Sequence, residues 1–520
     1  MVSTNNPLAL TMDQGGSGFD QIHLLDPETG ATRLLTDGRS LNNRMVWDQA
    51  GRRLAWRSTR RNGHSNDIWV MDVNAPAQAR MVWAAPDQAL WKPVRFSRDG
   101  RLLLVQQYRN ITDSRIHLLD LDSGQMQELV GLEDQPSSNI AIGFDADQAG
   151  FFFVSNKRGR SAEIGWAPLQ PDQPKRYVRD AIDWDVTRFE LSPDGRRGAF
   201  VTNEDGISRL YLFNPGRLSY RAVKGVPIGV IGDLRFSPDG RRLGMTISTP
   251  TSPANAYVLK LGLFNSVRGT ARAWTTALPD SLAAEQLVVP TLFRYPAPGV
   301  AEDRPLMIPG FAYLPPGQGP FPVVIYIHGG PESQFQPSYN SLVQMWAAQL
   351  GVAVLAPNVR GSLGYGLGYL SLDDGRRRED AVRDIGALLD TIERTPVLDS
   401  SRVAVFGASY GGYMALASAV HYSDRLVAAI DRAGISNFVT YLENTQDYRR
   451  DLRRGEYGDE RDPEMRAFLE SISPLNNVDR IGIPLLIVQG QNDPVVPVSE
   501  SQQLVDALRR RGQTVWYMNA

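Results

Sequence analysis

The stretch Arg402-Val-Ala-Val-Phe-Gly-Ala-Ser-Tyr-Gly-Gly-Tyr-Met414 decides how the second half of this chain folds. Its first five residues are mostly apolar and β-branched or aromatic, which predicts a buried strand. From Tyr413 to Val420 the sequence is an Ala-rich apolar run without a helix breaker, which predicts a helix. Between them, Gly407, Ser409 and Gly411 form the pattern G-x-S-x-G. A strand, a tight turn and a helix in this order are the context in which that pattern exposes a nucleophilic serine.

The same glycine pattern also occurs in turns that carry no chemistry, so the surrounding sequence has to decide. From Phe321 onward, buried apolar strands alternate with helical segments, which predicts a mostly parallel sheet covered on both faces. Sites in such sheets gather at the carboxyl ends of the strands. Three loops follow predicted strand ends, namely residues 328–331, 407–411 and 490–494. Their combination favours a catalytic serine over a bare turn.

Turns of the Asp-Gly type recur through the first half of the chain. The copies are Trp47-Asp-Gln-Ala-Gly-Arg52, Phe96-Ser-Arg-Asp-Gly-Arg101, the weaker Phe144-Asp-Ala-Asp-Gln-Ala-Gly150, Leu191-Ser-Pro-Asp-Gly-Arg196 and Phe236-Ser-Pro-Asp-Gly-Arg241. Short apolar strands surround each turn and no helical stretch intervenes, which is typical of β-propeller blades. Six blades are recognisable, the first over Leu8–Thr36. Pro253–Trp274 is expected to begin a last blade, which would make seven.

The totals agree with a chain of two domains. The 520 residues exceed what one core holds, and contents of 42% hydrophobic and 22% charged residues are ordinary for globular proteins. A net charge of −2 gives no basic surface for nucleic acid or an anionic membrane, and no cysteine is present to form a disulfide or a thiolate metal site. We expect no cofactor, no metal, no nucleic acid and no membrane contact. Arg376–Arg378 and Arg509–Arg511 are interpreted as solvated faces.

A serine nucleophile needs a base, a group that orients the base, and donors for the oxyanion. Ser409 is the predicted nucleophile. The backbone N–H of Tyr410 and that of Gly330 are the predicted oxyanion donors. Asp493, just past a buried strand, is either the orienting acid or a turn residue before proline, and the first is preferred. His328 is either the base or an anchor of its own loop, and the second is preferred.

The base is the member that the sequence does not supply. In α/β-hydrolases the catalytic residues follow the order Ser, Asp, His. No histidine follows Asp493 in these 520 residues. His421 lies twelve residues beyond Ser409 on the same predicted helix, roughly 18 Å away, and is out of reach. We expect the 520-residue chain by itself to be inactive or nearly so.

The motifs together resemble the prolyl oligopeptidase family of serine peptidases. They are His328-Gly-Gly-Pro331, Asn358-Val-Arg-Gly-Ser-Leu-Gly-Tyr-Gly366, Gly407-Ala-Ser-Tyr-Gly-Gly412 and Gly490-Gln-Asn-Asp-Pro494, behind a propeller. The acylaminoacyl-peptidase and dipeptidyl-aminopeptidase branch is the most similar. The resemblance implies a β-propeller over residues 1–283 and an α/β-hydrolase domain over residues 284–520 whose C-terminal part is missing.

The resemblance also implies the activity. Ser409 and Asp493 would be two triad members, Tyr410 and Gly330 would form the oxyanion hole, and the missing histidine would lie in a loop after the last predicted strand. The propeller would restrict entry to short peptides. Phe438 and Tyr441 either line an apolar substrate pocket or are ordinary core.

Two other functions remain open, namely a carboxylesterase with the same triad and a non-catalytic propeller that binds peptides or proteins. No leader is visible in residues 1–6, so we expect a cytoplasmic protein, or a periplasmic or secreted one if the start has been trimmed. A homo-oligomer is possible.

Overall fold

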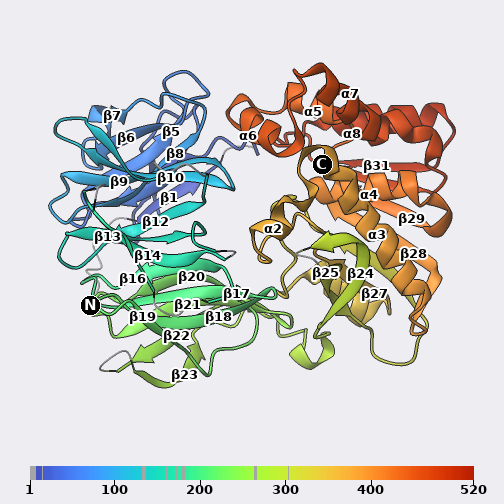
Figure 1. The fold of residues 1–520 in the computed structure, drawn as a ribbon, viewed down its shortest axis with the longest axis horizontal. Coiled ribbons are helices and arrows are strands. Elements are labelled where there is room, and N and C mark those ends of the chain that lie inside the picture. Colours follow the sequence, from blue (N-terminus) through green and yellow to red (C-terminus); the bar gives the residue numbers. More distant parts are fainter. Residues whose placement is uncertain are drawn as a thin grey trace.

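The computed structural model describes residues 8–13, 16–131, 136–159, 161–170, 173–178, 182–262, 266–301 and 304–520. Residues 1–6, on which the expectation about a leader rests, lie outside this set. The chain folds into two domains side by side, a propeller in blue to green and a sheet domain in yellow to red (Figure 1). No helix in the described part is long and apolar enough to cross a membrane.

Six antiparallel sheets form the propeller in the described part of the chain. The first sheet has three strands, β1 (Leu8–Met12), β2 (Gln21–Leu25) and β3 (Thr32–Leu34). The second and third hold β4 (Asn42–Trp47), β5 (Arg53–Ser58), β6 (Asp67–Asp72), β7 (Arg80–Trp83), β8 (Leu90–Phe96), β9 (Leu102–Asn110), β10 (Asp113–Asp120) and β11 (Met126–Val130). The last three hold β12 (Asn139–Phe144), β13 (Gly150–Ser155), β14 (Glu163–Pro168), β15 (Arg176–Tyr177), β16 (Val186–Leu191), β17 (Gly198–Glu204), β18 (Ile207–Asn214), β19 (Ser219–Ala222), β20 (Val230–Phe236), β21 (Arg242–Thr249), β22 (Ser252–Leu261) and β23 (Val267–Ala273).

The repeated turns join the first two strands of a blade. Gly100, between β8 and β9, has a φ of +70°, a conformation that glycine adopts without strain. In the weaker copy Gln148 takes this conformation, with a φ of +58°, and Gly150 instead begins β13. The expectation of a seventh blade was wrong, because residues 253–274 supply β22 and β23, the outer strands of the sixth sheet. The Asp-Gly turn at Gly240 had already opened that blade.

The second domain is built on one eight-stranded sheet of the order β24-β25-β27-β26-β28-β29-β30-β31. Its strands are β24 (Thr291–Ala301), β25 (Arg304–Tyr313), β26 (Phe321–Ile327), β27 (Ala353–Pro357), β28 (Leu398–Ala408), β29 (Ala428–Arg432), β30 (Leu485–Gln489) and β31 (Val515–Asn519). β24 and β25 pair antiparallel, and the six strands from β27 to β31 in this order pair parallel. The sheet is therefore mostly parallel, as predicted.

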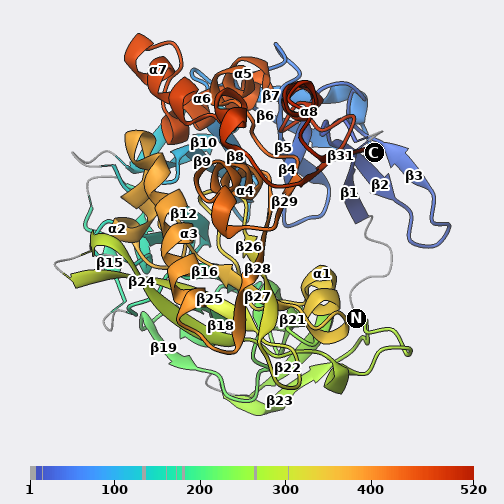
Figure 2. The same cartoon turned by 90° about the vertical axis from the view of Figure 1, so that its right-hand side faces the viewer.

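Helices cover this sheet. They are α1 (Ser341–Gln344), α2 (Leu367–Leu370), α3 (Arg378–Glu393), α4 (Tyr410–His421), α5 (Phe438–Asn444), α6 (Asp447–Tyr457), α7 (Pro463–Ile472) and α8 (Val498–Arg510). The helix expected near residues 341–350 begins as α1 and continues as a π-helix over Met345–Gln349. Figure 2 shows α1 and α3 on opposite sides of the central strands.

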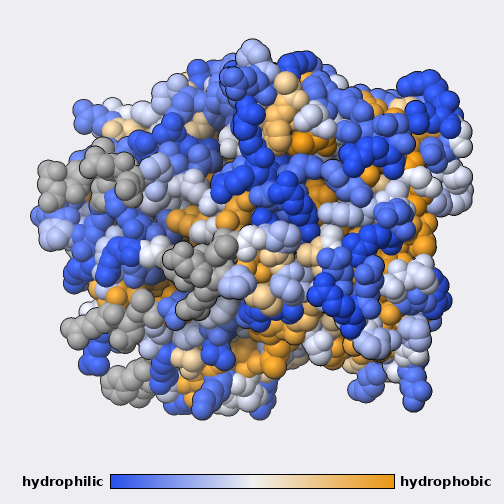
Figure 3. All heavy atoms as spheres, turned by 45° about the vertical axis from the view of Figure 1, so that its right-hand side comes forward, coloured by the Kyte–Doolittle hydropathy of each residue, from blue (hydrophilic) through white to orange (hydrophobic). Residues whose placement is uncertain are grey.

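Alternate residues of the buried strands pack into two cores, one on each face of the sheet. In β27, Ala353 and Leu355 join the large core with α3, α4 and α8, whereas Val354 and Ala356 join a smaller core around Phe335. On the face that Figure 3 shows, hydrophilic residues predominate and hydrophobic residues lie in smaller patches. Because both faces of the sheet are packed, the ends of its strands are held in place. The predicted catalytic residues lie at these strand ends.

Candidate active site

Ser409 lies on a strained turn between β28 and α4. Its φ of 56° and ψ of −123° fall in a region that residues with a side chain rarely adopt. The neighbouring glycines leave no room for a side chain, because a Cβ on Gly407 would lie 1.8 Å from the Gly411 carbonyl oxygen and a Cβ on Gly411 would lie 2.2 Å from that of Ile327. Ser409 is half-buried rather than enclosed in the core. The G-x-S-x-G pattern therefore folds as the predicted elbow.

The loop after β26 packs against this elbow. A Cβ on Gly329 would lie 2.9 Å from the carbonyl oxygen of Ala408 and 3.3 Å from the Ser409 Cβ. Gly330, the predicted oxyanion donor, follows with a φ of +137°. The other predicted donor, the Tyr410 N–H, is at the first position of α4, where helix N–H groups have no partner within the helix. Both predicted donors thus belong to segments that meet at Ser409.

His328 anchors its loop, as preferred from the sequence. Its Nδ1 donates to the Gly329 carbonyl at 2.8 Å, and its Nε2 lies 2.9 Å from the Ser362 Oγ. The ring is buried, and burial lowers the pKa of His328. Because both ring nitrogens have partners within the loops, His328 holds Gly329 in place rather than offering a free base.

Asp493 follows β30, at the same edge of the sheet as Ser409. β28, β29 and β30 are parallel neighbours, so one strand separates the two residues' parent strands. The N–H groups of Val495 and Val496 donate to the Asp493 Oδ1 at 2.8 and 3.1 Å, and they fix the half-buried carboxylate. The first blade covers this loop, because a Cβ on Gly18 would lie 2.7 Å from the Pro494 Cγ. No motif in the sequence predicts that contact between the domains.

Phe438 and Tyr441 are core residues, the second of the two alternatives left open. They are 0% and 2% exposed. The Phe438 ring packs on Tyr413 at 4.6 Å between centroids and on Tyr457 at 5.1 Å. We therefore leave both residues out of the candidate site.

A buried charge network that no sequence motif predicts lies beside the elbow. Arg378 was interpreted as part of a solvated face, which is wrong, since it is 1% exposed. Its guanidinium donates to Asp373 at 2.5 Å and to Glu456 at 2.6 Å. Its neighbours Arg376 and Arg377 are exposed, as expected. A run of arginines alone does not reveal which one faces inward.

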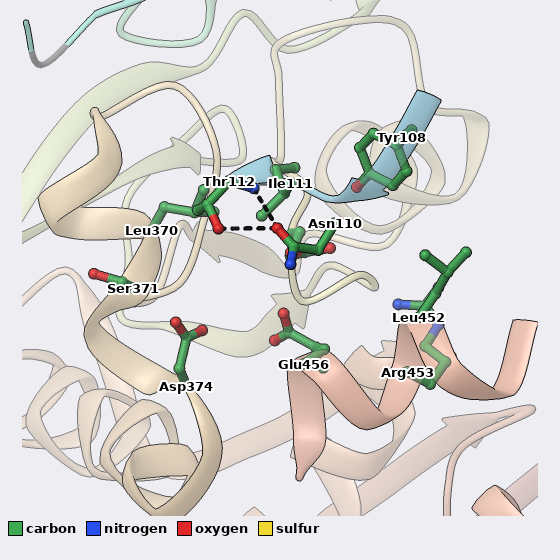
Figure 4. A pocket seen from close by; sticks show the side chains of 12 residues that line it. Tyr108, Asn110, Ile111, Thr112, Leu370, Ser371, Asp374, Leu452, Arg453 and Glu456 are labelled. Carbon is green, nitrogen blue, oxygen red and sulfur yellow. Dashed lines mark hydrogen bonds between the residues drawn. The ribbon is translucent and has the colours of Figure 1, made fainter. Parts of the chain in front are cut away.

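Glu456 also borders a cavity between the domains. It has a volume of about 190 Å³ and lies under the β9–β10 turn of the propeller. Figure 4 shows its lining, with Glu456 and Asp374 below and residues 108–112 above. Glu332, two residues after Gly330, also lines it. Burial and the adjacent Glu456 carboxyl raise the pKa of Glu332 to about 8.

This cluster suits an organic cation better than a metal ion. One oxygen each of Asp373, Asp374 and Glu456 lies within 4.8 Å of the others, a spacing that a metal ion could bridge. The Arg378 guanidinium already forms ion pairs with Asp373 and Glu456. Glu332, Asp374 and Glu456 line the cavity, and of these Glu332 and Asp374 form no ion pair with Arg378.

Comparison with known proteins agrees with this geometry. The model of the prolyl oligopeptidase N-terminal β-propeller domain matches residues 1–262, and the model of the prolyl oligopeptidase family matches residues 337–520. The chain belongs to the prolyl oligopeptidase family. Members of this family are serine peptidases, and the expected family is thereby confirmed.

The family members that we compare match different portions of this chain. Dipeptidyl peptidase family member 6 of Caenorhabditis elegans is 28% identical over 74% of this chain and 54% of that protein. Dipeptidyl aminopeptidase BIII of Pseudoxanthomonas mexicana is 34% identical over 38% of this chain and 29% of that protein. The chain thus spans about half or less of these curated relatives. A puromycin-hydrolyzing peptidase of Mycobacterium tuberculosis has the same fold, with a TM-score of 0.84 at 21% identity over 99% of this chain and 82% of that one.

Proposed function

We propose that this protein is a serine peptidase that cleaves short peptides through an acyl-enzyme on Ser409. The observation that carries the proposal is the strained elbow, which meets the Gly329–Gly330 loop and shares a sheet edge with Asp493. Attack by the Ser409 Oγ on a peptide carbonyl would place the developing oxyanion between the N–H groups of Tyr410 and Gly330. Asp493 would orient the base.

The base in this proposal is a histidine beyond residue 520. Among the five histidines of the sequence, His328 is held by its own loops and His421 pairs with Glu379 at 2.7 Å. The other three belong to the propeller. The 520-residue chain alone should therefore be inactive or nearly so, whereas the product of the full native reading frame should be active.

The acidic cavity supports a substrate with a free amino terminus over an acylated one. Glu332 brings a carboxyl group close to Gly330, and three carboxyls against one guanidinium, that of Arg453, line the cavity. An ammonium group bound to a carboxylate is stabilised by about 1.5–3 kcal/mol, or roughly 10- to 100-fold in affinity. An N-acetylated substrate has no ammonium group, so it would lose this stabilisation. The carboxyls that line the cavity would then have no cationic partner on the substrate.

The test compares an alanyl p-nitroanilide with its N-acetyl analogue on the full-length protein. We expect kcat/KM to favour the free amine by at least about tenfold, and Glu332→Gln to reduce that ratio. Glu190→Gln is the matched control, since Glu190 is a largely buried carboxyl that pairs with Arg235 in the propeller. Equal rates on the two substrates would contradict the preference, and faster turnover of a p-nitrophenyl ester than of any peptide would favour an esterase.

A further inference from the structure

Arg378 contacts Tyr410 directly and reaches Gly330 through Tyr457, so it touches both sides of the proposed oxyanion hole. It is the first residue of α3 and one of the largest fully buried side chains in the described part of the chain. A buried arginine must be matched by acceptors, and Asp373 and Glu456 supply them. These two carboxylates explain how a charged arginine can be buried. They do not explain why its guanidinium lies beside the rings of Tyr410 and Tyr457.

The first contact is with the residue that follows the nucleophile. The Arg378 Nη1 lies 3.4 Å from the Tyr410 hydroxyl, and its guanidinium carbon lies 5.3 Å from the centre of the Tyr410 ring. Tyr410 is 1% exposed, and its side chain packs in the core against Arg378. The backbone N–H of Tyr410 is one of the two proposed oxyanion donors, and its buried side chain anchors the first residue of α4 in the core.

The second contact leads to Gly330. Arg378 Nη2 donates to the Glu456 carbonyl at 2.8 Å, and the guanidinium carbon lies 5.2 Å from the Tyr457 ring. The Tyr457 hydroxyl in turn donates to the Gly330 carbonyl at 3.4 Å. The rings of Tyr457 and Tyr410 stack at 6.1 Å and 16°. One guanidinium therefore packs against both side chains that hold the donor segments.

We propose that Arg378 is a positioning residue that sets the spacing between the Tyr410 and Gly330 N–H donors. This rests on the proposed function, because the donors matter only if Ser409 attacks a carbonyl. The planar fork of an arginine can bind two carboxylates and pack on two rings at once, which a lysine ammonium cannot do. Oxyanion donors act mainly in the transition state, so a shift in their spacing lowers kcat and leaves substrate binding nearly unchanged.

The test compares Arg378→Lys with Arg360→Lys in the full-length protein. Arg360 is the matched control, since it is 7% exposed on its side chain and forms a buried ion pair with Asp384 in the same domain. We expect Arg378→Lys to lower kcat by about 10- to 100-fold, with KM changed less than about threefold. Affinity for a peptide boronate, which mimics the tetrahedral intermediate, should fall by a similar factor. The control should keep both values while losing thermal stability.

A purely structural role for Arg378 predicts a different result. In that case Arg378→Lys would keep kcat and boronate affinity within about twofold of the wild type, and the proposal would be overturned. If Arg378→Lys does not fold, Tyr457→Phe removes only the hydroxyl that reaches Gly330. A lowered kcat at unchanged KM then supports the proposal, and an unchanged kcat overturns it. A wild type without any peptidase activity would instead overturn the proposed function, and this inference with it.

Discussion

The backbone N–H of Ser409 donates a hydrogen bond of 2.9 Å to the carbonyl of Arg432. Arg432 is the last residue of β29, so the bond ties the elbow to the neighbouring strand end. The conformation of Ser409 costs about 1–3 kcal/mol because its φ and ψ suit only glycine. The sheet therefore holds Ser409 in a conformation that an isolated turn would leave.

This strain predicts that glycine at position 409 stabilises the fold relative to alanine. Ser409→Gly and Ser409→Ala both remove the hydroxyl, but only glycine adopts a φ of 56° and ψ of −123° without strain. Allowing for the greater freedom of glycine in the unfolded chain, we expect the Gly variant to be more stable by about 1 kcal/mol. Urea unfolding of the two variants measures this. A less stable Gly variant would mean that the elbow is not strained.

The close contact at Gly411 predicts a large loss of stability on adding one methyl group. A Cβ there would lie 2.2 Å from the Ile327 carbonyl oxygen, and that backbone cannot move without disturbing β26. We expect Gly411→Ala to lower the free energy of unfolding by about 3 kcal/mol or more. Gly455→Ala in α6 is the control, since nothing lies within 4 Å of its added Cβ. It should be neutral or raise stability by up to about 1 kcal/mol, and equal losses in both variants would refute the account of the elbow.

Asp431 predicts a specific dependence of stability on pH. This β29 residue is 1% exposed, and neither carboxyl oxygen meets hydrogen-bond geometry with a described residue. Burial raises the pKa of Asp431 to about 7 from an ordinary 3.8, although the nearby Gly434 N–H opposes the rise. The folded protein therefore keeps a proton that the unfolded chain has released. The contribution of this proton to the free energy of unfolding is complete below about pH 4 and is lost as the pH rises through 7.

Asp431→Asn removes this loss because asparagine does not ionise. The free energy of unfolding of the wild type should decrease between pH 5 and pH 8. The decrease in Asp431→Asn over the same range should be smaller by about 1–3 kcal/mol. Urea unfolding at the two pH values gives both numbers. The exposed Asp280→Asn should follow the wild type. Parallel pH curves for wild type and Asp431→Asn would show that the buried carboxyl does not titrate in this range.

Much of the fold followed from local pattern. The period of Asp-Gly turns predicted the blades because such turns have one preferred conformation, and the elbow glycines predicted a strand, turn and helix because bulkier residues clash there. The blade count was wrong for a related reason. Blades with three or four strands repeat the same turn, so counting strands after Gly240 could not show that residues 253–274 close the sixth sheet.

The surroundings of the candidate site could be predicted less well, because they depend on contacts distant in sequence. Glu332 and Glu456 carry no motif, and only the packing of α6 against the loop after β26 brings them together. Arg378 was hidden in an arginine run whose other members are exposed. For Phe438 the sequence could not distinguish a substrate-pocket residue from a core residue, because an aromatic residue after a strand is compatible with both. Side-chain burial was the missing information in each case.

Covalent labelling shows whether Ser409 is the reactive nucleophile. Full-length protein would be treated with a fluorophosphonate, digested and analysed by mass spectrometry, with Ser409→Ala as the control. We expect a single adduct on the peptide that contains Ser409, no adduct in Ser409→Ala, and loss of peptidase activity in step with labelling. Peptidase activity that persists after complete labelling, or in Ser409→Ala at the wild-type rate, would contradict this role of Ser409.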